Sequence, residues 1–126
     1  MVSSRVVASD IGFTEGPVWT RDGRLLVTSI SHGAIYEVGE GEAHVVAQTD
    51  GGPNGMAEGE DGTLYVTQNG GLYAGGTSPK PATPGIQQVA AGNVSYLACQ
   101  RPWGDQPDRQ TPRRHCHRSS RARLLP

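Results

Sequence analysis

The apolar residues of this chain come in short runs separated by turn residues. Residues 18–20 and 25–29 flank Arg-Asp-Gly-Arg, which is typical of a hairpin turn because glycine tolerates the positive φ that such turns need. Apolar runs at 34–38 and 43–48 follow, each preceded by glycine-containing turns. The pattern predicts four short strands joined by tight turns.

A second set of runs follows the same plan. Residues 56–58 and 63–68 flank the turn Glu-Asp-Gly, the pair Leu72-Tyr73 closes this half as Ile35-Tyr36 closes the first, and 74–84 has a loop composition. Runs at 86–89 and 94–97 are expected to complete the set, and the β-branched run at 5–8 favours an edge strand. No stretch has an apolar period of 3.6 residues, so no helix is predicted.

The two sets form an internal repeat. Asp22-Gly23 and Asp61-Gly62 are 39 residues apart, and at this spacing Glu15 corresponds to Asn54, Leu25 to Leu64 and Val27 to Val66. A repeat of about 40 residues with strand-type content is typical of the four-stranded blades of a β-propeller. We therefore expect two blades with superposable Asp-Gly turns.

The composition changes near residue 100. The net charge of −1 combines −6 in residues 1–100 with +5 in residues 101–126, where arginine and proline are frequent and lysine is absent. Alternation stops there and no third repeat follows. We expect a disordered tail, since such a sequence buries too little apolar area to offset its ordering entropy. An arginine-rich arm for an anionic partner is the functional alternative.

Glu15 and Asn54 are the candidate site residues. Each precedes a glycine at the start of its repeat, and the first strands of propeller blades line the central channel, so the two side chains are expected to converge at its mouth. Their oxygens suit a hard cation such as Ca²⁺, which takes about 6–8 oxygen ligands, so two do not suffice. The alternatives are a turn residue for Asn54, within Pro-Asn-Gly, and a surface carboxylate for Glu15.

The remaining candidates for chemistry are weaker. His32 and His44 lie in a turn and a strand and form no constellation. His115-Cys116-His117 contains ligand types, but adjacent side chains point apart and nothing nearby completes a tetrahedral set. There is no nucleophile elbow, phosphate loop or dinucleotide fingerprint.

One segment reads Glu-Gly-Pro-Val-Trp from Glu15 and is followed by Asp-Gly-Arg-Leu-Leu-Val-Thr. A second reads Gly-Pro-Asn-Gly-Met-Ala around Asn54 and is followed by Asp-Gly-Thr-Leu-Tyr-Val-Thr. Together they resemble the opening of a gluconolactonase-type propeller. This family groups senescence marker protein, gluconolactonases and luciferin-regenerating enzyme. The resemblance covers about residues 5–98. It implies a six-bladed propeller of which two blades are present, a divalent metal, Ca²⁺ or Zn²⁺, in the channel, and hydrolysis of sugar lactones or similar esters.

Under this resemblance Glu15 matches the first metal ligand of the family. Asn54 matches a channel-facing position with a role in contacting substrate or supporting the ligands. The remaining ligands, carried by later blades, have no counterpart here, so the chain lacks most of the active site and we expect it to bind no metal alone. The family's third blade should open with Pro-Asn-Asp, whereas this chain has Arg-Pro-Trp-Gly-Asp.

The prediction is thus an all-β chain. Residues 1–99 form the first two blades of a six-bladed propeller, and residues 100–126 form an Arg/Pro-rich disordered tail, whose change in charge and composition suggests out-of-frame translation. The expected function is that of the N-terminal part of a metal-dependent lactone hydrolase, inactive alone. The alternative is a small β-rich interaction module that oligomerises. The partner expected for the full-length family is a small-molecule lactone, and no nucleic acid or membrane partner is expected. The lack of a signal peptide or apolar span favours the cytoplasm.

Overall fold

The computed structural model describes residues 1–99, and this part of the chain is all-β. The predictions for residues 100–126 lie outside the described residues. No helix occurs in residues 1–99, and hence none that is long and apolar enough to cross a membrane. The strands are β1 (Thr14–Trp19), β2 (Leu25–Ser29), β3 (Ala34–Gly39), β4 (Glu42–Gln48), β5 (Pro53–Glu58), β6 (Leu64–Gln68), β7 (Leu72–Tyr73), β8 (Gly76–Thr77), β9 (Gly85–Ala90) and β10 (Asn93–Cys99).

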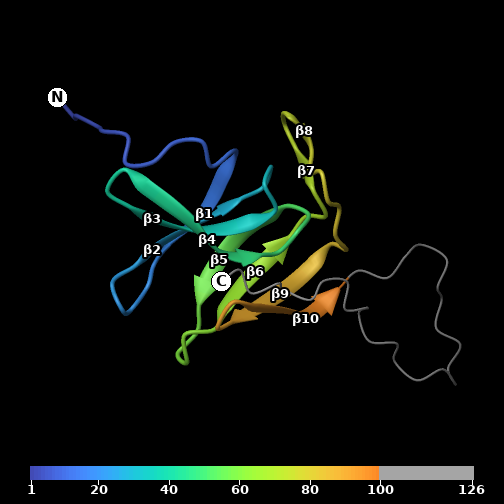
Figure 1. Ribbon diagram of the computed structural model, residues 1–126. Coiled ribbons are helices and arrows are strands. Elements are labelled where there is room, and N and C mark those ends of the chain that lie inside the picture. The colour runs from blue at the N-terminus through green and yellow to red at the C-terminus, as the bar shows by residue number, and fades with distance from the viewer. Residues whose placement is uncertain (100–126) are drawn as a thin grey trace, which may run out of the picture.

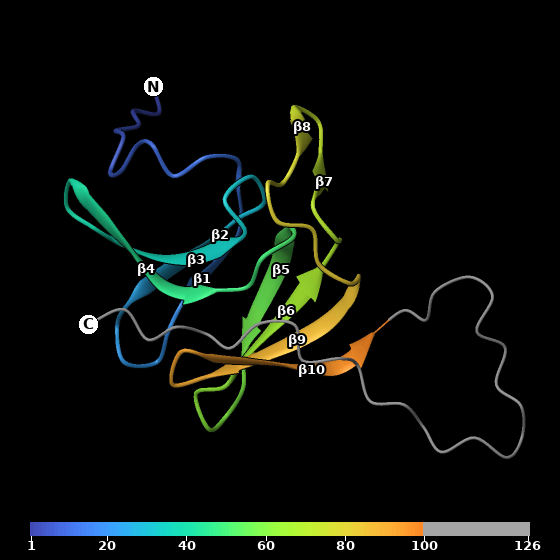
Figure 2. The same cartoon turned by 45° about the vertical axis from the view of Figure 1, so that its right-hand side comes forward.

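Eight of these strands form two four-stranded antiparallel sheets (Figure 1). The first has the order β1-β2-β3-β4, and the second has the order β5-β6-β9-β10. Both are meanders of sequential strands, except that β7 and β8 are inserted between β6 and β9 of the second sheet. The prediction of two antiparallel four-stranded units is confirmed. Strands β7 and β8 pair only with each other, in a hairpin that projects beyond the second sheet (Figure 2).

The first two strands of each sheet pair in the same register. Thr14 lies opposite Ser29 and Trp19 opposite Leu25, and 39 residues later Pro53 lies opposite Gln68 and Glu58 opposite Leu64. In both pairs the register shifts once, within the segment that contains the glycine after Glu15 or Asn54. The repeat seen in the sequence is therefore a repeat of backbone pairing, bulge included.

The turns that join these strands also correspond. The Thr20 amide donates to the Arg24 carbonyl over 2.8 Å, and the Gly59 amide donates to the Thr63 carbonyl over 2.8 Å. Gly23 and Gly62 have φ of 85° and 83°, a conformation that strains any residue with a Cβ. Glycine after aspartate is thus required by both turns.

The outer strands repeat as well, with a larger spacing. Val38 pairs with Leu25 and Ala43, and Val89, 51 positions later, pairs with Leu64 and Val94. The last pair of strands in each sheet carries a second bulge, at residue 46 in β4 and at residue 97 in β10. All four strands of one sheet therefore have a counterpart in the other.

The larger spacing corrects one expectation. Leu72-Tyr73 is not the third strand of the second sheet; it belongs to the separate hairpin, and Ile86-Gln87 takes the place of Ile35-Tyr36. The connection between second and third strands spans residues 30–33 in the first sheet and 69–84 in the second. The β-branched run at 5–8 forms no strand, so that prediction is also wrong.

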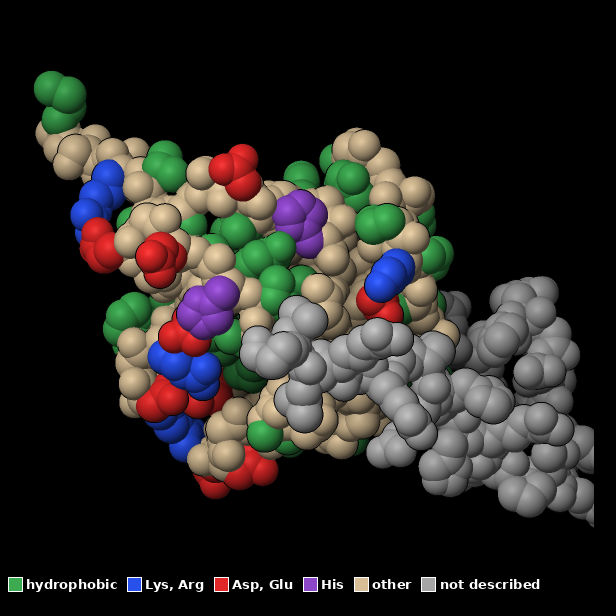
Figure 3. Space-filling model, viewed as in Figure 1, with side chains coloured by type: hydrophobic (Ala, Val, Ile, Leu, Met, Phe, Trp, Pro, Cys, Tyr) green, Lys and Arg blue, Asp and Glu red, His purple; other side chains and the backbone are tan. Residues whose placement is uncertain are grey.

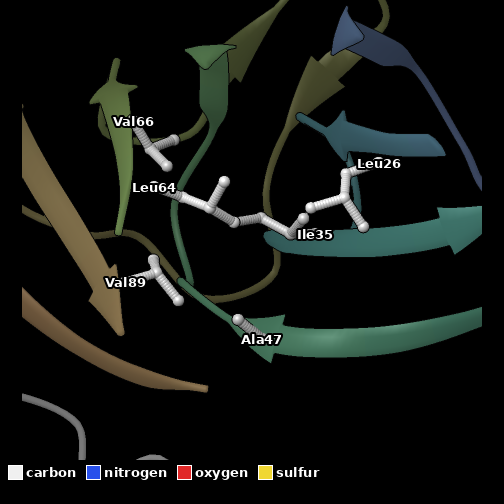
Figure 4. Packing of buried hydrophobic residues seen from close by; sticks show 6 residues of the cluster. All are labelled: Leu26, Ile35, Ala47, Leu64, Val66 and Val89. Atoms are coloured by element: carbon white, nitrogen blue, oxygen red, sulfur yellow. The ribbon is translucent and has the colours of Figure 1, made fainter. Parts of the chain in front are cut away.

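The core lies between the two sheets. Leu26, Ile35 and Ala47 from the first sheet meet Leu64, Val66 and Val89 from the second, and all six are buried (Figure 4). Strand β1 lies beside β5, so the first strands of the two sheets are neighbours. Burial of these side chains, worth about 1.5–3 kcal/mol for each Leu, Ile or Val, is the main force holding the sheets together.

Candidate functional site

Glu15 and Asn54 occupy equivalent positions at the start of neighbouring strands. Each precedes the glycine in the bulged segment of its strand, β1 or β5. Asn54 lies inside β5, so its interpretation as a turn residue is wrong. Because both strands begin at the same end of adjacent sheets, the end that carries Glu15 also carries Asn54.

The two strands are in close contact at this point. Gly16 has φ of 45°, and a Cβ there would overlap the carbonyl oxygen of Asn54. The hydroxyl of Thr28, the residue paired with Glu15, donates to the same carbonyl over 2.7 Å. A residue without a side chain is therefore needed after Glu15 both for the backbone conformation and for contact between the strands.

The side chains of Glu15 and Asn54 have no hydrogen-bond or ion-pair partner among residues 1–99. Glu15 is exposed and Asn54 is half-buried, and neither side chain forms a hydrogen bond or ion pair with another described residue. Their oxygens are thus available to a ligand at this end.

The connections between second and third strands surround the same end. The longer one carries the β7–β8 hairpin, and its Tyr73 ring stands against the Phe13 ring with centroids 6.0 Å apart. The shorter one carries His32, whose Nδ1 lies 2.8 Å from the Tyr36 hydroxyl oxygen. The sequence predicted a loop over 74–84, where the structure has the second strand of this hairpin, β8. Its location suits a role in shaping access to the site, as loops on a rigid scaffold often have.

A buried amide network, which the sequence analysis did not predict, supports this end from below. The Gln68 side-chain oxygen accepts from the amides of Gly52, at 2.5 Å, and Gly70, at 2.9 Å, and its nitrogen donates to the Asp50 carbonyl at 2.9 Å. Gln68 also donates to the Gln87 side chain over 3.2 Å. These hydrogen bonds hold the linker between β4 and β5 and the start of the connection at 69–84 in place. The only indication of the network in the sequence is glutamine at positions of β6 and β9 that face inward.

Charged groups gather at the opposite end, around the Asp22–Gly23 turn. Arg24 pairs with Asp22 at 3.0 Å and with Glu37 at 3.6 Å. The Thr20 hydroxyl donates to the Asp22 carboxylate, and this hydrogen bond, followed by those from Arg24, lowers the pKa of Asp22 below its ordinary 3.8. A hydrogen bond from the Thr63 backbone amide likewise lowers the pKa of the Asp61 carboxyl. The carboxylates of Asp22 and Asp61 thus accept hydrogen bonds that stabilise the two turns.

Residues 1–99 contain no cluster of three or more His, Cys, Asp or Glu side chains placed to bind a metal. On the face seen in Figure 3 the acidic side chains lie mainly on the left of the view, several of them beside a Lys or Arg. Glu15 with Asn54 offers one carboxylate and one amide oxygen, where Ca²⁺ takes about 6–8 oxygen ligands. Glu15 and Asn54 therefore fit as two of the oxygen ligands of such a cation, and further ligands are needed to complete the coordination.

Comparison with protein-family models finds no family that matches this chain, and comparison with curated proteins finds no match either. The likeness to gluconolactonase-type propellers therefore rests on the residues quoted above.

Proposed function

We propose that this chain is the N-terminal, two-sheet part of a metal-dependent sugar-lactone hydrolase of the gluconolactonase-like family, built as a six-bladed β-propeller. The proposal is supported first by the repeated register. Two meanders with the same pairing, turns and bulges are what successive propeller blades would have.

The way the sheets stack gives the main support. The first sheet uses the face that carries Leu26 and Ile35, whereas the second uses the face that carries Leu64 and Val66, which corresponds to the opposite face of the first. The packing is therefore head to tail, and such an arrangement continues from unit to unit until it closes into a ring. A propeller is the ring that four-stranded sheets form in this way.

Glu15 and Asn54 are the residues assigned to the site in this proposal. Glu15 would be one ligand of a divalent cation at the channel mouth, and Asn54 would face the substrate or hold another ligand in place. A bound cation would polarise the carbonyl of a lactone ring and favour attack on it by water. The other ligands would come from later blades, so the 126-residue chain is expected to be inactive alone.

The test begins with the coding DNA. Read in the adjacent frame from near codon 99, it should encode further Asp-Gly turns at blade spacing and a Pro-Asn-Asp opening for the third blade. The extended protein should then hydrolyse a sugar lactone such as glucono-lactone when supplied with a divalent metal. Stop codons in the adjacent frames, or an extended protein without lactonase activity, would contradict the proposal.

A matched pair of variants tests the residue assignment in the extended protein. Glu15→Gln should lower kcat/KM by at least roughly 100-fold, since it removes a charged ligand. Glu60→Gln, at an exposed carboxylate in the turn at the other end, should leave the activity unchanged. Equal effects of the two variants would show that Glu15 is a surface carboxylate.

A further inference from the structure

The second sheet has an exposed apolar face. Tyr65 on β6, Ile86 on β9 and Leu97 on β10 are 38%, 40% and 60% exposed, and Ala98 beside them is also exposed. Ile86 is paired with Ala98 and with Thr67, and Tyr65 stands two residues before Thr67, on the same face of the sheet. We call the side formed by Tyr65, Ile86, Leu97 and Ala98 the free face of the second sheet.

The counterparts of these residues in the first sheet form the core. Tyr65 corresponds to Leu26, Ile86 to Ile35, and Ala98 to Ala47, which are 1%, 0% and 4% exposed. Leu97 corresponds to the bulge residue Val46, which packs against the core. The same surface is thus covered in one sheet and open in the other.

The repeat also indicates what kind of surface covers it. In the first sheet the cover is the side of the second sheet that carries Leu64, Val66 and Val89. The counterparts of these three residues are Leu25, Val27 and Val38, which are only partly buried, and Trp19 lies opposite Leu25 on the same side at 71% exposure. We call this side, with Trp19, Leu25, Val27 and Val38, the free face of the first sheet.

We infer that a second copy of this chain docks head to tail, with the free face of its first sheet on the free face of the second sheet. Both halves of the contact are present in every chain, and their residue pattern is that of the contact already made between the two sheets. Contiguous apolar surface of this kind on a soluble protein marks an interaction site. The contact is heterologous, because it joins two different surfaces, so it propagates into a chain or closes into a ring of copies.

One polar feature of the existing contact has its counterpart at the new one. The Thr28 hydroxyl donates to the Asn54 carbonyl of the neighbouring sheet over 2.7 Å. Thr67 is the counterpart of Thr28 and is exposed, and its hydroxyl accepts from the Gly55 amide over 2.8 Å and donates to the Gly55 carbonyl over 3.3 Å within the sheet. Glu15 is the counterpart of Asn54. In the docked pair Thr67 of one copy therefore faces the Glu15 carbonyl of the next. The inference concerns the 126-residue chain and does not depend on lactone hydrolysis.

Sedimentation velocity of the full chain over a wide concentration range tests the inference, with far-UV circular dichroism as the check on folding. The wild type should form discrete oligomers whose mass rises with concentration. Leu97→Asp and Trp19→Asp each place a charge in one half of the contact and should weaken association by more than about 100-fold. Leu72→Asp is the matched control, because Leu72 is 68% exposed in the β7–β8 hairpin, outside both free faces, and it should associate like the wild type.

A mixing experiment tests the head-to-tail geometry. The Leu97→Asp chain keeps an intact first sheet and the Trp19→Asp chain keeps an intact second sheet, so an equimolar mixture should give a 1:1 heterodimer that grows no further. A symmetric contact would instead leave one of the two variants self-associating and the mixture without a heterodimer. Evidence for a symmetric contact would overturn the inference. So would a wild type that stays monomeric at all concentrations, or amorphous aggregation that neither aspartate variant prevents.

Discussion

Ile35 and Ile86 offer a direct measurement of what sheet packing contributes to stability. They are the same residue type at the same point of the repeat, in the third strand of each sheet, opposite Thr28 and Thr67 respectively. Ile35 is fully buried between the sheets, whereas Ile86 is 40% exposed. Truncation of each to alanine therefore differs mainly in whether another sheet covers the side chain.

The expected magnitudes follow from that difference. Replacing isoleucine by alanine removes about three methylene-sized groups, worth about 0.8 kcal/mol each when fully buried, and leaves a cavity in a packed core. Ile35→Ala should thus lower the free energy of unfolding by about 3–4 kcal/mol. Ile86→Ala should lower it by about 1–1.5 kcal/mol, because part of the side chain is already in water and solvent fills the space. The loss of β-propensity, up to about 1 kcal/mol, affects both variants equally.

Urea unfolding followed by far-UV circular dichroism measures both values, at a concentration low enough to keep the chain monomeric. Unchanged m-values would show that the comparison is one of stability alone. The reasoning would be refuted if Ile86→Ala cost as much as Ile35→Ala in the dilute monomer, since the free face would then be covered within the chain itself. A rise in the cost of Ile86→Ala with concentration would instead support docking of a second copy.

Three further outcomes are expected. Gln68→Leu should destabilise the fold by about 2–4 kcal/mol in urea unfolding, because it leaves two backbone amides without an acceptor, whereas Gln48→Leu on an exposed position should change stability little. Gly16→Ala should cost more than Gly23→Ala: both have positive φ, but only the first would push a Cβ into a neighbouring strand, and thermal melts of the two compare them. Asp22 has a folded-state pKa below the ordinary 3.8. Its contribution to the free energy of unfolding is therefore complete above pH 3.8 and declines as the pH falls through the folded-state pKa. Asp22→Asn should flatten this decline when urea unfolding is measured at acid pH.

The candidate site also leads to an expectation for metal. Isothermal titration of the 126-residue chain with Ca²⁺ or Zn²⁺ should give no tight stoichiometric binding, because Glu15 is the single charged ligand assigned to the site. A tight site on this chain alone would contradict the assignment and would require ligands beyond Glu15 and Asn54.

The sequence by itself determined the local elements. The Asp22-Gly23 and Asp61-Gly62 turns and the strands at 25–29 and 64–68 are fixed by short-range rules, since glycine permits the turn and alternation defines the strand. It also placed Glu15 and Asn54 at equivalent points. It misassigned Leu72-Tyr73, because an apolar residue beside a tyrosine has the same appearance in a sheet and in a detached hairpin; strand pairing is set by partners distant in sequence.

Only the tertiary structure decided which faces are buried. Leu26 and Tyr65, or Ile35 and Ile86, occupy equivalent positions in the same alternating pattern, yet the first of each pair is core and the second is surface. Alternation assigns side chains to the two faces of a sheet and does not say which face meets another sheet. The close approach at Gly16, which brings Asn54 beside the strand of Glu15, is likewise a contact between sheets that residue spacing along one chain does not encode.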